Sequence, residues 1–598
     1  MSLPAPSFLN SSRVAMAAVL ALLLASCSGG GDAPAPQPSA PVNPLAMFTQ
    51  QKLDWQACNP DLFDADIRAV GARLTCTSMR APLDYNNPAL GELSVALMRA
   101  SAEQPQQRLG AIAFNTGGPG EDGLLYGAYL ASLFAKANPA DPAGKLLKDM
   151  SNRYDMIGFS PRGVGASTSL SCTSSYLLQP EYNSTFDRSP ENIQNKQSNE
   201  RLKAETCAKN PLTKHIHTDA TARDMDLMRG LLGDEKLNYI GYSYGTWLGT
   251  WYASLFPERV GRMLLDSSMN VTGTFDDAKL LSVVGRQRVM DEIIFPFAAR
   301  NDKLFNLGDN AGLIRSRVLA LSPVLKDVVI TSSRLNDPKE FEENSYLLTA
   351  AVGLQALRDK MPGADQRSIS AAIETYPFTA EPGNAKAVNF ALQFNTFFYT
   401  QPKRPPVSLG ASDSTYLSVI CNDLATTGDA QYWAAVGNEY AKQYPLTGGS
   451  ISNVCVYWGA PYGMRPPLAN AAKAGPLLML QSRYDAPTPI EGALKTLGAL
   501  PNASMIVVEN EYKHTLFPYD GGCVDAQVAG YFVNGVMPPR TTSCPGKLLP
   551  AGAFVATTPQ SSSKAGVEPP SKAYTDPAKA AELMQRIHQR RGDGALKF

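Results

Sequence analysis

The apolar positions of this chain fall into short continuous runs that alternate with stretches of helical spacing. From Asp224 to Leu232 the apolar side chains recur every three or four residues, which predicts an amphipathic helix that Gly233 can cap. The short apolar runs predict buried strands at residues 111–114, 237–240, 262–265, 476–481 and 503–509. Strands that alternate with helices indicate an α/β fold with a mostly parallel central sheet flanked by helices.

This alternation divides the chain into a core and an insertion. Residues 45–270 and 411–545 form the two predicted parts of the core. Between them, residues 271–410 contain long helical patterns, such as Leu347 to Leu357, which predict an inserted, largely helical lid. Residues 546–598 are expected to be a polar tail, partly disordered, with a short charged helix at its end.

The first 44 residues have the features of an export signal followed by a tether. Arg13 precedes the apolar run Val14 to Leu24, which is too short to span a membrane and predicts a cleaved signal over residues 1–26. The small residues before Cys27 are typical of a bacterial lipoprotein signal, so Cys27 is the expected lipidation site. Ordinary cleavage nearby without a lipid is the alternative. Residues 27–44 form a flexible Pro/Gly/Ser-rich tether, so we expect an exported protein, lipid-anchored at the bacterial cell envelope or secreted.

The composition limits which partners and cofactors we expect the protein to bind. The chain has 598 residues, is 44% hydrophobic and has a formal net charge of zero, so it can bury a large core and has no basic stripe for nucleic acid. Neither Cys-x-x-Cys nor His-Glu-x-x-His occurs, and His215 and His217 have no evident third ligand. We therefore expect neither a metal nor a cofactor. The oligomeric state is left open.

The segment from Leu237 to Gly249 carries the strongest chemical signal. It places Ser243 in Gly-Tyr-Ser-Tyr-Gly, between an apolar strand and a helix that ends before Pro257. In such a nucleophile elbow the turn is too tight for larger side chains two residues from the serine. Ser243 is therefore the predicted nucleophile.

A nucleophilic serine requires a histidine as base, and the known elbow enzymes carry the order serine, acid, histidine. That order excludes His215 and His217. His588 lies in the charged terminal tail, where a solvated helix face explains it. His514, which follows the predicted strand at 503–509, is the candidate base.

The acid is expected after a strand that precedes this histidine. Asp485 follows the strand at 476–481 in a loop that prolines make rigid, and it is the predicted acid. Asp266, at the end of the strand at 262–265, is the competing candidate, and its other role would be to cap a turn.

The oxyanion donors are expected to be backbone amides. One is Tyr244, directly after the nucleophile, and the other is Gly117 or Gly118, in the glycine-rich loop after the strand at 111–114. The same loop matches Gly-x-Gly-x-x-Gly from Gly118 to Gly123, a dinucleotide fingerprint. That interpretation is disfavoured because it leaves the elbow unexplained.

Nine cysteines minus Cys27 leave eight, an even number that is typical of disulfides in an oxidising compartment. Their spacing favours the pairs Cys58 with Cys76, Cys172 with Cys207, Cys421 with Cys455, and Cys523 with Cys544.

Several motifs occur in a fixed order along the chain. They are Ala81-Pro-Leu-Asp-Tyr85, Gly117-Gly-Pro-Gly120, Pro161-Arg-Gly-Val-Gly165, the elbow, Asp485 in Asp-x-x-Thr-Pro, and Cys523-Val-Asp ahead of Cys544. Together they resemble the secreted tripeptidyl aminopeptidases, relatives of proline iminopeptidase within the α/β-hydrolase superfamily. The resemblance implies the α/β-hydrolase fold. Thr116, Ser160 and Lys513 depart from the family pattern, which affects the rim of the pocket and no member of the predicted triad.

The resemblance also implies a serine exopeptidase that releases short peptides such as tripeptides, or single residues, from a free amino terminus. Such an enzyme must bind an α-ammonium, and the candidates by position are Glu342, Glu343, Asn422 and Asp423. Phe390, Phe394, Phe397, Phe398 and Tyr399 form an aromatic cluster that either lines a pocket or fills the lid core. The alternatives are a carboxylesterase with the same triad and a non-catalytic surface-binding lipoprotein.

Overall fold

The computed structural model of this chain describes residues 44–182, 186–333, 338–400, 402–519, 521–547 and 572–592. The predicted signal, Cys27 and almost all of the tether lie outside these ranges, as do residues 548–571 of the tail and the side chain of His588. Within the described ranges, no helix combines the length and the apolar character needed to cross a membrane.

A ten-stranded sheet forms the centre, in the order β1-β2-β3-β5-β4-β7-β8-β10-β11-β12. Its strands are β1 Gln56–Ala57, β2 Leu74–Pro82, β3 Glu92–Ala100, β4 Gly110–Asn115, β5 Tyr154–Phe159, β7 Leu237–Tyr242, β8 Val260–Asp266, β10 Leu477–Ser482, β11 Ala503–Glu509 and β12 Thr541–Pro545. The pairs β1 with β2, β2 with β3 and β3 with β5 are antiparallel, and all pairs from β5 to β12 are parallel. The predicted mostly parallel α/β sheet is confirmed.

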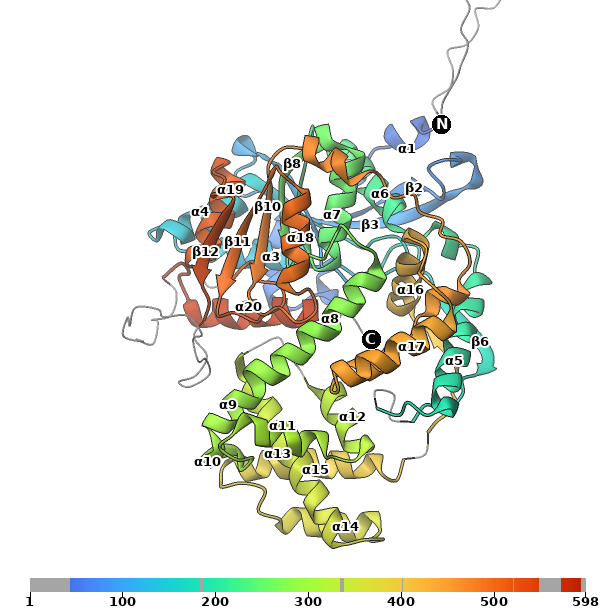
Figure 1. Ribbon diagram of the computed structural model, residues 1–598. Coiled ribbons are helices and arrows are strands. Elements are labelled where there is room, and N and C mark those ends of the chain that lie inside the picture. The colour runs from blue at the N-terminus through green and yellow to red at the C-terminus, as the bar shows by residue number, and fades with distance from the viewer. Residues whose placement is uncertain are drawn as a thin grey trace, which may run out of the picture. The chain divides into compact units, whose positions relative to one another are not determined.

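Helices cover both faces of the sheet, which explains why its strands are continuous apolar runs (Figure 1). One face packs against α6 (Thr218–Leu231), α7 (Tyr244–Leu255) and α18 (Ile490–Ala499). The opposite face packs against α3 (Tyr126–Ala135), α4 (Pro142–Arg153) and α19 (Cys523–Asn534). Neighbouring strand residues alternate between the faces, so Tyr239 and Ile240 belong to different hydrophobic clusters.

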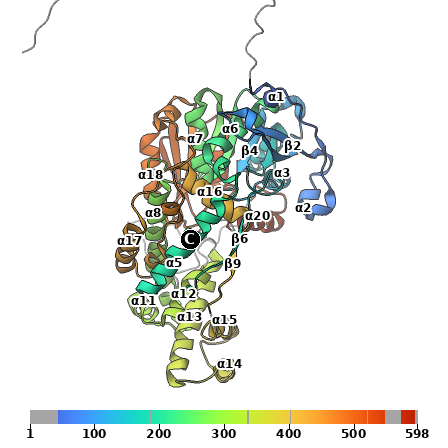
Figure 2. The ribbon, with the colours of Figure 1, turned by 90° about the vertical axis from the view of Figure 1, so that its right-hand side faces the viewer.

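The stretch after β8 is helical, and Figures 1 and 2 show its helices gathered beyond one end of the strands. They are α8 Phe275–Val289, a π-helical turn Met290–Ile294, α9 Phe295–Arg300, α10 Asp302–Phe305, α11 Ala311–Leu319, α12 Pro323–Ser332, α13 Pro338–Lys360, α14 Gln366–Thr375 and α15 Gly383–Phe397. These helices bury a hydrophobic cluster of their own.

Further elements extend this helical part beyond the predicted boundary at residue 410. They are α16 Ala411–Asp423 and α17 Ala430–Gln443, and the short strand β9 Pro406–Leu409, which pairs antiparallel with β6 Cys172–Leu177. The helix α5 (Pro190–Ala208) lies beside them (Figure 2). The central sheet resumes only at β10, so residues 411–476 add helices and turns to the lid side instead of strands to the core.

The C-terminal helix α20 (Pro577–Gly592) packs on the hydrophobic core. Its Ala580, Leu583 and Ile587 are buried in the same cluster as α3, and Arg586 forms an ion pair with Asp66. From the sequence we expect a helix here, but one with a solvated face. The apolar positions at intervals of three and four residues give it a face that packs.

Four disulfide bonds cross-link the described part of the chain. They join Cys58 to Cys76, Cys172 to Cys207, Cys421 to Cys455, and Cys523 to Cys544. Each therefore closes a local loop, and together they are typical of a protein in an oxidising, extracellular compartment.

Candidate active site

The turn between β7 and α7 holds Ser243 in an unusual backbone conformation. Ser243 has φ of 54° and ψ of −117°, outside the regions that non-glycine residues favour. A Cβ at Gly241 would lie 2.4 Å from the oxygen of Gly245, and one at Gly245 would lie 2.9 Å from the oxygen of Asn115. Only glycine fits at these two positions, so the local geometry is that of a nucleophile elbow.

His514 lies against the Asp485 carboxylate at the ends of β10 and β11. Its Nδ1 atom is 3.0 Å from Oδ1 and 2.9 Å from Oδ2 of Asp485, and both side chains are buried. The N–H of Thr488 donates to Asp485 Oδ1 at 2.8 Å and fixes the acid. Nε2 of His514 is buried and has no hydrogen-bond partner in the described part of the chain. A ring oriented at one nitrogen and open at the other is arranged to accept a proton.

Asp266 ties the elbow to the histidine loop. Its backbone oxygen accepts the N–H of Ser243 at 2.9 Å, and its carboxylate accepts the N–H groups of Leu516 and Phe517 at 2.7 to 3.0 Å. Burial raises the pKa of Asp266 to about 7, and these backbone hydrogen bonds oppose that rise. The structure therefore brings His514 to Asp485 and uses Asp266, the competing candidate, to position the histidine loop.

The glycine loop after β4 lies against the elbow. Gly117 and Gly118 have φ of 104° and 99°, which glycine alone adopts readily, and a Cβ at Gly117 would lie 3.2 Å from Ser243 Cβ. The Gly117 N–H donates to Asn115 Oδ1 at 3.1 Å. Among the described residues, the N–H groups of Gly118 and Tyr244 donate to no acceptor. These two amides are therefore the ones available to an oxyanion.

Two of the four positional candidates for the substrate amine are buried at the end of α16. Asn422 donates to two backbone carbonyls at 2.7 and 2.9 Å and accepts from Trp458 Nε1 at 2.7 Å. Asp423 accepts the N–H and O–H of Thr218 and the indole N–H of Trp247. Burial raises the pKa of Asp423 to about 7. Buried and hydrogen-bonded in this way, both side chains hold α16 to the core and neither is open to a substrate, which corrects the positional expectation.

The other two candidates lie on α13. Glu342 and Glu343 are exposed, and Glu342 pairs with Lys386 at 3.0 Å on the lid surface. The structure therefore offers no buried surrounding in which either carboxylate would select an ammonium ion.

The predicted aromatic cluster falls on α15 and the residues directly after it. Phe394 is buried in the lid cluster and stacks with Phe390, Phe397 is exposed, and Arg358 lies 3.7 Å above the ring of Phe398. Most of the cluster is thus lid core, which is the second of the two roles that the sequence left open.

His215 and His217, which precede the elbow in the chain, make hydrogen bonds that stabilise the local backbone. His217 Nδ1 accepts the N–H of Ala220 at 3.2 Å and caps α6, and burial lowers the pKa of His217 to about 3. The carbonyl of His215 accepts from Arg162 at 3.1 Å. Across the described ranges, no group of three or more His, Cys, Asp or Glu side chains is arranged to hold a metal ion.

One helix that borders the site was not predicted from the sequence to lie there. Helix α8 packs directly on the loop of Asp485, since a Cβ at Gly285 would lie 2.4 Å from the oxygen of Ala486. Burial lowers the pKa of the neighbouring Arg286, and the negative charge of Asp485 opposes that change. The first lid helix therefore forms part of the wall of the candidate active site.

The chain is similar to several known proteins. The family model described as an alpha/beta hydrolase fold matches residues 111–336, and the model described as TAP-like protein matches residues 447–544. The tripeptidyl aminopeptidase of Streptomyces coelicolor is 27% identical over 83% of this chain and 87% of the relative. The serine protease Hip1 of Mycobacterium tuberculosis is 24% identical over 83% and 91%, and carboxylesterase B of the same species is 25% identical over 85% and 93%. The solved proline iminopeptidase of Mycobacterium smegmatis matches with a TM-score of 0.31 and 12% identity, over 77% of this chain and 98% of that one.

The sheet order, the elbow and the matched regions define the class of protein: an α/β hydrolase that uses serine. The chain is a serine hydrolase of this superfamily, and it is similar to a tripeptidyl aminopeptidase and to the serine protease Hip1.

Proposed function

We propose that this enzyme is a serine exopeptidase that releases short peptides, tripeptides above all, from the free amino terminus of peptide substrates. The observation that carries the proposal is the His514–Asp485 pair, because it orients the ring and leaves Nε2 open. Asp266 fastens the loop of this histidine to the backbone of Ser243. The similarity to an aminopeptidase named for tripeptides supplies the substrate class.

The proposed mechanism is acyl transfer with Ser243 as nucleophile. His514 Nε2 takes the proton of the Ser243 hydroxyl as its oxygen attacks the peptide carbonyl, and Asp485 stabilises the imidazolium that forms. The N–H groups of Gly118 and Tyr244 donate to the developing oxyanion. His514 then gives its proton to the leaving amine. A water molecule, deprotonated by the same ring, attacks the acyl-enzyme and regenerates the serine.

A carboxylesterase is the second candidate, and the similarity to carboxylesterase B favours it specifically. Esterase and peptidase share the triad and the oxyanion donors, so the difference lies in whether the cleft recognises an amino terminus.

The test compares peptidyl p-nitroanilides that have free or acetylated amino termini with short acyl p-nitrophenyl esters. We expect the highest kcat/KM for a free tripeptidyl anilide. Asp485→Asn should lower kcat by about 10³- to 10⁴-fold with the fold retained, since it disturbs the tautomer of His514. Ser243→Ala should abolish labelling by a fluorophosphonate probe. Preference of the wild-type enzyme for acetylated anilides or for esters would contradict the exopeptidase proposal, and labelling that survives Ser243→Ala would contradict the role of this serine.

We further propose that the enzyme is exported and anchored through a lipid on Cys27. The four disulfides support export. Cys27→Ala should move the activity from the membrane fraction to the soluble fraction of the host, and an unchanged distribution would contradict the anchor.

A further inference from the structure

The glycine-rich loop after β4 turns back on itself beside the elbow. A Cβ at Gly118 would lie 3.0 Å from the nitrogen of Gly120 and 3.2 Å from the nitrogen of Glu121. The first arm of the turn carries the Gly118 N–H, one of the two amides available to an oxyanion. Because the two arms are in close contact, a shift of residues 120–122 also displaces the Gly118 N–H.

Asp122 ties the second arm of this loop to the turn after β5. The Ser160 hydroxyl donates to Asp122 Oδ1 at 2.8 Å, and the N–H of Leu124 donates to the same oxygen at 3.0 Å. Gly165 has a φ of 59°, and a Cβ there would overlap Asp122 Oδ2 and lie 2.6 Å from Ser160 Oγ. The close approach of the carboxylate therefore explains the last glycine of the motif at residues 161–165.

The turn that carries Ser160 is fixed to the core. Ser160 lies directly after β5 and is fully buried. Its N–H donates to the oxygen of Ala96 in β3 at 3.1 Å, and its own backbone oxygen accepts the hydroxyl of Ser167 at 2.6 Å. Two residues later, the buried Arg162 forms an ion pair with Asp224 of α6 at 2.7 Å. A buried polar network of this kind is rigid, so the Ser160 hydroxyl is a fixed point for the loop.

Helix α16 packs on the other side of the loop. A Cβ at Gly120 would overlap the oxygen of Ser412 and lie 3.1 Å from the nitrogen of Tyr416. Near its end, α16 is cross-linked through Cys421 to Cys455, and both cysteines belong to a buried cluster that α5 shares. The loop thus lies between α16 and the turn of Ser160.

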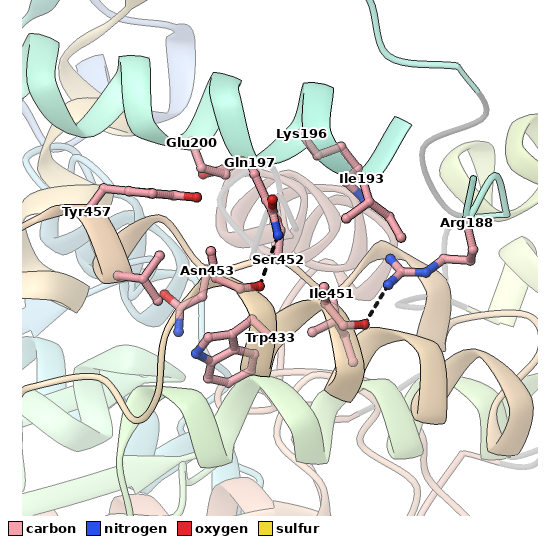
Figure 3. A pocket seen from close by; sticks show the side chains of 13 residues that line it. Arg188, Ile193, Lys196, Gln197, Glu200, Trp433, Ile451, Ser452, Asn453 and Tyr457 are labelled. Carbon is pink, nitrogen blue, oxygen red and sulfur yellow. Dashed lines mark hydrogen bonds between the residues drawn. The ribbon is translucent and has the colours of Figure 1, made fainter. Parts of the chain in front are cut away.

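The helices that adjoin α16 are closely packed. Figure 3 shows the cavity between α5, α17 and residues 451–457, where Gln197 Nε2 donates to the oxygen of Ala430 at 3.0 Å and Arg188 Nη2 to that of Ala434 at 2.9 Å. This cavity has room for about one water molecule. None of these elements carries a residue of the predicted triad or an oxyanion donor. The cavity is therefore a gap in the packing of the lid side.

We propose that the hydrogen bond between Ser160 and Asp122 positions the N–H of Gly118 for the oxyanion. Both are positioning residues that act through the loop. The inference rests on the proposed acyl transfer at Ser243, and it applies to peptide and ester substrates alike. An oxyanion forms only as the carbonyl is attacked, so loss of this hydrogen bond should slow the reaction and leave substrate binding unchanged.

The experiment measures kcat and KM of wild type, Ser160→Ala, Asp122→Ala, the double variant and Asp122→Asn, on the anilide or ester that wild type hydrolyses best. Each alanine variant should lower kcat about 10- to 100-fold and change KM less than about twofold, because a displaced oxyanion donor loses much of its effect. The double variant should lose no more than Asp122→Ala, because both changes remove the same hydrogen bond. Asp122→Asn keeps an oxygen acceptor and should retain more activity than Asp122→Ala.

Ser151→Ala is the matched control. The buried Ser151 hydroxyl also donates to a carboxylate, that of Glu103, at 2.8 Å, and Ser151 lies in α4, which carries no residue of the predicted site. Urea unfolding should give similar midpoints for Ser151→Ala and Ser160→Ala, while only Ser160→Ala loses kcat. Asp122 is exposed, so Asp122→Ala carries the test if Ser160→Ala does not fold.

An unchanged kcat of either alanine variant would overturn the proposal, as would single losses that multiply in the double variant. Fluorophosphonate labelling should slow by about the same factor as kcat, since the phosphonyl oxygen occupies the oxyanion site. Labelling that survives Ser243→Ala contradicts the proposed nucleophile, and a wild-type preference for esters contradicts the exopeptidase. These failures are therefore distinguishable from failure of the Ser160–Asp122 proposal.

Discussion

The N–H of Ser243 donates to the backbone oxygen of Asp266 at 2.9 Å, where β7 and β8 both end. The carboxylate of the same aspartate holds the N–H groups of Leu516 and Phe517. One buried residue thereby sets the position of the nucleophile and of the loop that carries His514. Among the described residues, the Asp266 side chain makes no hydrogen bond with the imidazole, yet the placement of the imidazole depends on Asp266.

Asp266→Asn should therefore lower activity through geometry. An amide in place of the carboxylate presents an NH₂ group to one of the backbone donors, which costs about 1 to 3 kcal/mol of stability and loosens the histidine loop. We expect kcat to fall more than tenfold. Urea unfolding of the same samples measures the loss of stability. Asp155→Asn is the control, because Asp155 is also buried and hydrogen-bonded but lies in β5, where it contacts Arg108. It should lose stability and keep kcat. If both variants keep kcat, Asp266 does not position the loop.

Gly117→Ala should prevent acylation of the serine. The new Cβ would lie 2.7 Å from the oxygen of Tyr242 and 3.2 Å from Ser243 Cβ, so either the elbow or the oxyanion loop has to move. Gly233→Ala is the matched control, because Gly233 also has a positive φ of 77° but open space around it. Both variants incur backbone strain, on the order of 1 kcal/mol. Only Gly117→Ala should lose fluorophosphonate labelling, and equal labelling of the two would contradict the close packing of loop and elbow.

The pH dependence of folding should reveal the buried carboxyl of Asp423. Burial raises its pKa in the folded protein to about 7, so the folded state keeps this proton at pH values where the unfolded chain releases it. Stability from this group is fully present below about pH 4 and is lost as the pH rises to about 7. The unfolding free energy of wild type should therefore fall by a few kcal/mol over this window relative to Asp423→Asn.

Urea unfolding of both proteins at steps between pH 4 and pH 8 measures this difference. Asp365→Asn is the control, because Asp365 is an exposed cap of α14 and its pKa is lowered by its hydrogen bonds with Ser368. The control should not reproduce the slope. A difference between wild type and Asp423→Asn that stays constant over the window would show that Asp423 is ionised throughout.

Local patterns were sufficient to predict the elbow and five of the ten strands of the central sheet, β4, β7, β8, β10 and β11. The apolar run at 237–240 and the glycines around Ser243 specify their conformation through sterics alone, and the structure forms β7 and the turn there. The pairing of His514 with Asp485 is long-range, yet the chain order of elbow hydrolases was enough to select both residues, and the structure brings them together. Their catalytic roles stay predictions for the kinetic tests.

The burial of polar side chains depends on tertiary packing, so it could not be predicted from local patterns. Asn422 and Asp423 are polar, and nothing in their sequence neighbours indicates that α16 buries them against Thr218 and Trp247. Contacts between segments that are distant in the sequence decide this burial, and no motif indicates it.

The C-terminal helix should contribute to stability although it lies outside the regions of family resemblance. Leu583 of α20 is fully buried, and removal of its side chain beyond Cβ leaves a cavity that costs about 2 to 4 kcal/mol. Leu583→Ala should lower the unfolding midpoint in urea by the corresponding amount. Glu582→Ala, an exposed neighbour on the same helix, should leave it unchanged. The kcat of folded Leu583→Ala should equal that of wild type, because α20 packs on α3 and contributes no residue to the predicted triad. Equal midpoints for the two variants would show that α20 is not part of the cooperative core.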